Sequence, residues 1–100
     1  MAITTLYRDI LLDFAKEIAK SAKLVVDGNI VEYPIYKTLA EDGVIKHFIY
    51  PQEENVQITK AQLFDAQGRE LQYREFNVTK GLDGFAIVFV TQIEIKEATK

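Results

Sequence analysis

The stretch Phe85-Ala86-Ile87-Val88-Phe89-Val90 is apolar at every position, which sets it apart from most other strand-like runs of the chain. In those runs apolar and polar residues alternate, as they do in a strand with one buried and one solvent-facing side. A run without polar positions is typical of a strand that is covered on both faces. We therefore expect one face to pack against a helix and the other against a second sheet or a neighbouring subunit.

The pattern continues beyond this stretch and predicts a final strand from Phe85 to about Ile95. Its second face turns polar at Gln92, so only the first half of the strand needs cover on both sides. Two tyrosines of an earlier strand also have the apolar ring and polar tip that suit a protein interface. The candidate interface residues are Ala86, Val88, Val90, Tyr33 and Tyr36.

The amino-terminal segment from Thr5 to Ala22 is predicted to be an amphipathic helix. Apolar residues recur there at spacings of three and four, which places them on one helical face. These residues are Leu6, Ile10, Leu11, Phe14, Ile18 and Ala22. We expect this face to pack on the sheet of the same chain; the alternative is a groove that takes a helix from a partner.

From Lys23 onward the pattern is that of antiparallel strands joined by turns. Asp27-Gly28-Asn29 and Glu41-Asp42-Gly43 suit tight turns, and Pro34 indicates an edge strand or a bulge. Strands are predicted over 24–26, 30–36, 44–50, 56–64 and 69–78, before the final strand. The expected fold is a single α+β domain over residues 1–100: one helix, then a meander of about six strands, as a helix on a sheet or a small β-sandwich.

Composition limits the classes of function. The chain has 100 residues, a net charge of -3 and no cysteine, which excludes disulfides and thiolate metal sites. Because the basic residues form no stripe, we expect no nucleic-acid partner. No apolar run approaches the roughly 18 residues of a membrane span, and the first residues do not form a secretory signal. Synthesis in the cytoplasm without membrane insertion is the expectation.

The residues needed for common catalytic chemistry are scarce. His47 is the only histidine and Ser21 the only serine, so their number excludes a catalytic triad and a histidine-rich metal site. His47 has the opposite strand phase from Phe48 and is predicted to face solvent. The acidic pairs, which we expect to be solvated or to cap turns, are Asp9 with Asp13, Glu41 with Asp42, and Glu53 with Glu54. No catalytic, cofactor-binding or metal-binding residue is predicted.

Three segments carry a resemblance to a known group of proteins. They are Ile3-Thr4-Thr5-Leu6-Tyr7, the segment from Ile58 to Gly68 (ITKAQLFDAQG), and Val78-Thr79-Lys80-Gly81. In this layout the chain resembles small structural proteins from the tail modules of phages and prophages of Gram-positive bacteria. The resemblance implies a non-enzymatic virion or assembly component, located in the virion, whose partners are copies of itself or other structural proteins.

Two functions from different classes follow from these observations. The first is an interaction protein that presents a β surface to copies of itself or to other assembly components. The alternative is a small-molecule-binding or enzymatic domain, in which a helix lies against a curved sheet around an apolar cavity, as in cystatin-like or ketosteroid-isomerase-like folds. A cavity that contains His47 or a buried carboxylate would favour the alternative.

Overall fold

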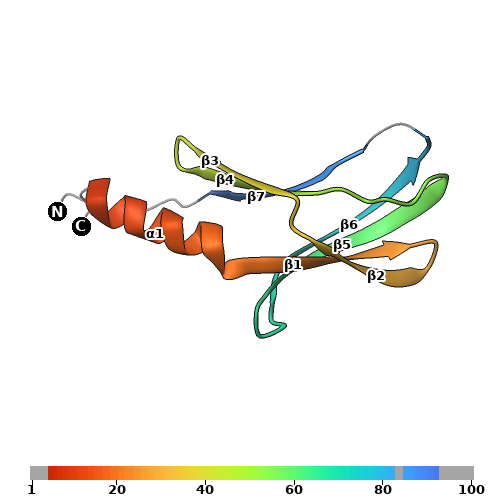
Figure 1. Cartoon of the computed structure of the whole chain (residues 1–100), viewed down its shortest axis with the longest axis horizontal. Coiled ribbons are helices and arrows are strands. Elements are labelled where there is room, and N and C mark those ends of the chain that lie inside the picture. The colour runs from red at the N-terminus through yellow and green to blue at the C-terminus, as the bar shows by residue number, and fades with distance from the viewer. Residues whose placement is uncertain (1–4, 83–84, 93–100) are drawn as a thin grey trace, which may run out of the picture.

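A computed structural model describes residues 5–82 and 85–92, and within them one helix precedes seven strands in two antiparallel sheets (Figure 1). This confirms the predicted α+β class, in the form of a sandwich. The elements are α1 (Thr5–Ile18), β1 (Ala19–Val26), β2 (Asn29–Pro34), β3 (Lys37–Glu41), β4 (Val44–Ile49), β5 (Val56–Asp65), β6 (Glu70–Lys80) and β7 (Ile87–Gln92). The strand that the sequence did not predict is β3. Its only aliphatic residue larger than alanine is Leu39, so it lacks a hydrophobic pattern.

The strands do not form one continuous meander. Their order is β2-β1-β5-β6 in the first sheet and β3-β4-β7 in the second. The two predicted tight turns are present: Asp27 and Gly28 join β1 to β2, and Asp42 and Gly43 join β3 to β4, all four with positive φ. These hairpins are local, whereas the pairs β1–β5 and β4–β7 join strands that are distant in sequence.

The chain crosses from the first sheet to the second just after Pro34. Strand β2 is an edge strand and ends at this proline, as its missing N–H group requires. The predicted extension of the strand through Ile35 and Tyr36 is wrong, because these two residues link the sheets and β3 begins at Lys37. The link is short, so the end of β2 lies near the start of β3, and the two strands run away from each other in different sheets (Figure 1).

The core lies between the two sheets. Its buried members from the first sheet include Leu24, Ile58 and Leu63, and those from the second sheet are Ile49, Ile87 and Phe89. The face of β7 that holds Ile87 and Phe89 is therefore covered by the opposite sheet. The prediction that the helix covers this face is wrong.

Helix α1 is shorter than predicted, since it ends at Ile18 rather than at Ala22. Ala22 fits both periods: it follows Ile18 by one helical turn, and it alternates with Leu24 and Val26 along a strand. Strand β1 pairs with β2 on one side and with β5 on the other. Pairing with β5 begins at Ala19, and pairing on both sides begins at Ser21, so this segment joins the sheet and the helix ends early.

The helix extends from one end of the sandwich instead of lying on a sheet (Figure 1). Leu6, Ile10 and Phe14 on its predicted inner face are 70%, 56% and 67% exposed. Leu12 approaches the β3–β4 hairpin, and Ala15 and Ile18 approach the end of the sandwich. The molecule measures 52 × 27 × 26 Å, so the projecting helix makes it elongated.

Candidate interaction surface

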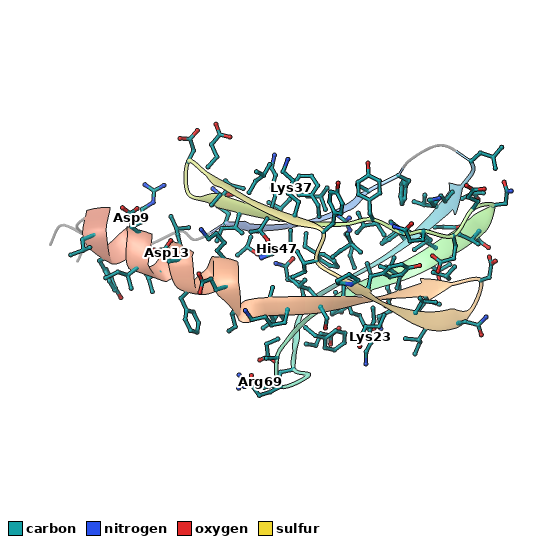
Figure 2. All side chains as sticks on the ribbon, in the orientation of Figure 1. Asp9, Asp13, Lys23, Lys37, His47 and Arg69 are labelled. Atoms are coloured by element: carbon teal, nitrogen blue, oxygen red, sulfur yellow. The ribbon has the colours of Figure 1, made fainter. Side chains whose placement is uncertain are left out.

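The outer face of the three-stranded sheet carries side chains in three rows that run across the strands. One row is Leu39, Lys46 and Val90, and a second is Lys37, Phe48 and Val88; each middle residue lies in β4 and pairs with both neighbours. The third row is Glu41, Val44 and Gln92. Lys37 points away from the opposite sheet in Figure 2, which identifies this face as the outer one.

Apolar side chains occupy much of this face. Leu39 is 43% exposed and Val90 is 51% exposed, whereas Val44, Phe48 and Val88 are half-buried by their neighbours. We call these five residues the outer patch. No described residue belongs to a further layer over the patch, since the structure forms two sheets and a helix that leaves from their end.

Two tyrosines extend the outer patch at one end. The amide of Tyr36 donates a hydrogen bond of 2.8 Å to the carbonyl oxygen of Phe48, which continues the β3–β4 ladder beyond Lys37. The rings of Tyr36 and Tyr50 meet with centroids 5.0 Å apart and planes inclined by 57°. Tyr36 is 68% exposed, so this tilted pair presents aromatic surface and hydroxyl groups beside the patch.

The predicted interface residues are only partly brought together. Val88 and Val90 lie in the outer patch, Ala86 is half-buried just before β7, and Tyr36 lies at the end of the patch. Tyr33 is different, because it is only 6% exposed and packs in the core. Its proposed place in an interface is wrong: β2 directs this ring between the sheets, and its hydroxyl has no partner among the residues described.

Sequence reasoning missed Leu39, Val44 and Phe48. In β4, Val44, Lys46 and Phe48 alternate with Ile45, His47 and Ile49, so both phases contain two large apolar residues. The predicted strand phase placed Phe48 in the interior, but the fold buries Ile45 and Ile49 instead. Because the two phases of β4 are equally hydrophobic, the sequence does not indicate which of them faces the interior.

His47 is buried, in contrast to its predicted solvent-facing position. It is 1% exposed and lies between the two layers (Figure 2). Its Nε2 lies 3.1 Å from the main-chain oxygen of Lys16, in the last turn of α1. Because a carbonyl oxygen only accepts, Nε2 must carry the proton of this bond.

His47 also lines a small cavity of about 180 Å³. Nδ1 has no hydrogen-bond partner among the described residues. The cavity is lined mainly by apolar side chains from α1, β1, β5 and β6, with two further polar residues, Gln72 and Thr91. Gln72 Nε2 donates a hydrogen bond of 2.6 Å to Thr91 Oγ1, which links β6 to β7 across the sandwich.

Two of the predicted acidic pairs lie around one cleft. Asp9 and Asp13 on α1 and Glu41 and Asp42 in the β3–β4 hairpin line it together with Arg8, and its volume is about 460 Å³ (Figure 2). The sequence predicted the two pairs separately, and the packing of the helix end against the hairpin brings them together. In the described part of the chain, no group of three or more histidine, aspartate or glutamate side chains could hold a metal ion.

Asp65 has a buried carboxylate that accepts hydrogen bonds within the turn between β5 and β6. Its Oδ1 accepts hydrogen bonds from the amides of Gln67 and Arg69, and its Oδ2 accepts one from Arg69 Nε. The Arg69 amide is the main cause that lowers the pKa of Asp65, burial opposes it, and the Arg69 guanidinium and Gln67 amide lower it further. Asp65 thus holds the β5–β6 turn.

A second apolar surface lies on the helix, where Leu6, Ile10 and Phe14 follow one another at successive turns. None of the described helices has the length and apolar character that a membrane span requires.

Comparisons of the chain with protein-family models, with curated proteins and with solved structures found no significant match.

Proposed function

We propose that this protein is a non-enzymatic structural or assembly protein that acts through protein–protein contacts. The outer patch is the observation that supports the proposal. It places Leu39, Val44, Phe48, Val88 and Val90 on one face, over which the described residues form no third layer. Contiguous apolar surface beside exposed aromatic rings is typical of a protein interface.

The chemistry of the patch favours a protein partner over nucleic acid. The rows contain Lys37, Lys46 and Glu41, so charges of both signs surround the apolar residues. A nucleic-acid surface instead needs clustered basic residues along the path of the phosphates. The partners we propose are further copies of the chain or other structural proteins, with no catalytic role and no cofactor.

The resemblance to tail-module proteins supports a more specific proposal, that the protein is a tail-associated component of a phage or prophage. It would then be made in the cytoplasm and located in the virion. The identity of the neighbouring genes tests this proposal: a cluster of tail genes is expected, whereas a metabolic operon would contradict it.

Light scattering coupled to size-exclusion chromatography, together with binding assays against the products of neighbouring genes, tests the role in assembly. We expect association that weakens in the double variant Leu39→Ser/Val90→Ser. The matched control is Ile30→Ser, which changes an aliphatic side chain on the other sheet that is even more exposed, at 69%. A strict monomer that binds none of these products would refute the proposal.

The buried His47 supports a second candidate function, the binding of a small molecule. His47, Gln72 and Thr91 are the polar residues that line an otherwise apolar cavity of about 180 Å³. A compact ligand with one hydrogen-bond donor and an apolar body matches that lining. NMR titration with small alcohols and amides is the test; shifts confined to the cavity residues, and lost in His47→Leu, would support binding, and their absence would contradict it.

A further inference from the structure

The four edge strands of the two sheets differ in how well they are protected against pairing with another chain. Edge strands normally carry charges, proline or bulges, because their unpaired main-chain groups would otherwise accept a further strand. Strand β2 contains Glu32 and Pro34, and β3 contains Lys37 and Glu41. Both therefore carry the protecting features.

Strand β6 is the best protected of these edges. It contains four charged residues, and its pairing with β5 has two register shifts, which interrupt a regular edge. The charged residues are Glu70, Arg74, Glu75 and Lys80.

Strand β7 has none of these features. Its sequence, IVFVTQ, contains no charge and no proline, and its pairing with β4 runs from Ile87 to Gln92 without a register shift. Among the residues described, β4 is its only hydrogen-bonded neighbour, so one edge carries unpaired N–H and C=O groups. The Gln72–Thr91 hydrogen bond holds this edge above β6.

We propose that β7 pairs with β7 of a second copy of this chain, antiparallel and about a two-fold axis. This inference rests on the proposed role in assembly and identifies the contact that assembly uses. The three-stranded sheets of two copies would join into one sheet with the order β3-β4-β7-β7-β4-β3. The main-chain groups at both unprotected edges would then be satisfied at once.

A second copy fits this edge for two reasons. First, the pairing gives a closed dimer, because it uses the one unprotected edge of each copy. The edges that remain free carry charge, proline or bulges. Second, β7 is self-complementary. With the axis at Phe89, Val88 lies opposite Val90 of the second copy, so β-branched residues pair on the outer face and no like charges meet. The two outer patches become one continuous surface.

Paired charge variants test both the contact and its register. The parent chain is expected to have twice its 11.4 kDa mass in light scattering. Val88→Lys/Val90→Lys places lysine opposite lysine across the axis and is expected to give the monomer mass. Val88→Glu/Val90→Lys places glutamate opposite lysine and is expected to restore the dimer.

The matched control is Ile30→Lys/Glu32→Lys, which creates the same Lys-x-Lys pattern at two exposed positions of the edge strand β2 in the other sheet. It is expected to remain a dimer. Since the chain has no cysteine, Val88→Cys/Val90→Cys gives a second test that does not depend on charge. We expect this pair to form a disulfide-linked dimer, and Lys37→Cys/Leu39→Cys to remain unlinked.

A dimer that survives Val88→Lys/Val90→Lys, dissociates in Ile30→Lys/Glu32→Lys, or forms no disulfide through positions 88 and 90 would overturn the β7 contact and leave the assembly role intact. A parent chain that stays monomeric would also overturn this contact. The proposed function itself would be refuted only if the chain were monomeric and also bound none of the products of the neighbouring genes.

Discussion

His47 Nε2 donates a hydrogen bond of 3.1 Å to the main-chain oxygen of Lys16 and so joins β4 to the last turn of α1. Helix termini leave their last carbonyl groups without partners inside the helix, and a buried imidazole satisfies one of them here. Because the helix otherwise projects from the sandwich, this bond helps to fix its direction.

Replacing His47 by leucine removes that donor while keeping a side chain of similar bulk. We expect a loss of about 1–3 kcal/mol in the free energy of unfolding, since the Lys16 carbonyl loses its partner. Urea denaturation measures the loss. Lys46→Ala, at the exposed neighbouring position, is the control and should change stability by less than about 0.5 kcal/mol. Equal stability of the two variants would contradict the role of the bond.

Because one apolar face of the helix is exposed, truncating an apolar side chain there should cost less stability than truncating one in the core. Phe14→Ala removes a ring that is 67% exposed and should cost less than about 0.5 kcal/mol. Ile58→Ala removes methyl groups from the centre of the core and should cost about 2–5 kcal/mol. Chemical denaturation of both variants at low protein concentration provides the comparison. A Phe14→Ala loss as large as that of Ile58→Ala would place the helix on a sheet after all.

Asp65 predicts an acid-dependent contribution to stability. Its pKa is lowered from the ordinary value of 3.8 in the folded state, chiefly by the Arg69 amide, so the folded chain binds this proton less readily than the unfolded chain. The stabilisation is therefore fully present above pH 3.8 and is lost as the pH falls through the lowered folded pKa.

Asp65→Asn should accordingly lower the urea midpoint at neutral pH and flatten its dependence on pH below about 4. Asp27→Asn is a suitable control, because Asp27 also accepts a main-chain amide, that of Gln57, but in an exposed position. If the parent and Asp65→Asn lose stability in parallel on acidification, another carboxylate is responsible.

Gly43 joins β3 to β4 with a φ of 77°, and a Cβ atom at this position would meet the guanidinium of Arg8. Gly68 has almost the same φ, 76°, and open space around it. Gly68→Ala should therefore cost about 1 kcal/mol from the backbone alone, and Gly43→Ala should cost only slightly more, because the flexible end of Arg8 must also move aside.

Thermal denaturation of the two glycine variants compares these costs, and Arg8→Ala/Gly43→Ala provides the check. Removing Arg8 should bring the effect of Gly43→Ala down to that of Gly68→Ala. A cost that does not change when Arg8 is absent would show that the helix does not press on the hairpin.

Two aspartate substitutions on the outer side of β7 should differ strongly. Val88→Asp places a charge beside Phe48 within the outer patch, whereas Gln92→Asp changes one exposed polar side chain for another at the strand end. We expect Val88→Asp to reduce association or folding far more than Gln92→Asp. Sedimentation together with denaturation measures both effects, and equal behaviour would contradict the assigned faces of β7.

Local patterns were enough to predict much of the fold. The Asp27-Gly28 and Asp42-Gly43 turns were predicted because few residues other than glycine, asparagine and aspartate adopt positive φ readily. Pro34 correctly indicated an edge strand, because it lacks the N–H group that an inner strand needs. The run of apolar residues from Phe85 likewise located β7 and its buried side at Ile87 and Phe89.

The sequence could not decide between two structural alternatives that are equally apolar. In β4 the phases of His47 and Phe48 are equally hydrophobic, and only the pairing with β3 and β7 turns the histidine inward. The end of α1 at Ile18 depends on partners for β1 that lie as far away as Asp65. Strand β3, with little hydrophobic signal, exists because β4 supplies its hydrogen bonds.

The amino-acid sequence thus determined the α+β class, the tight turns and the doubly apolar strand, since each follows from the conformational preferences and hydrophobicity of neighbouring residues. Tertiary packing alone decided which sheet each strand joined, that the helix left the sandwich, and that β7 became an uncharged edge. These outcomes depend on long-range strand pairing, in which the main-chain groups of one segment are satisfied by another segment that local sequence does not specify.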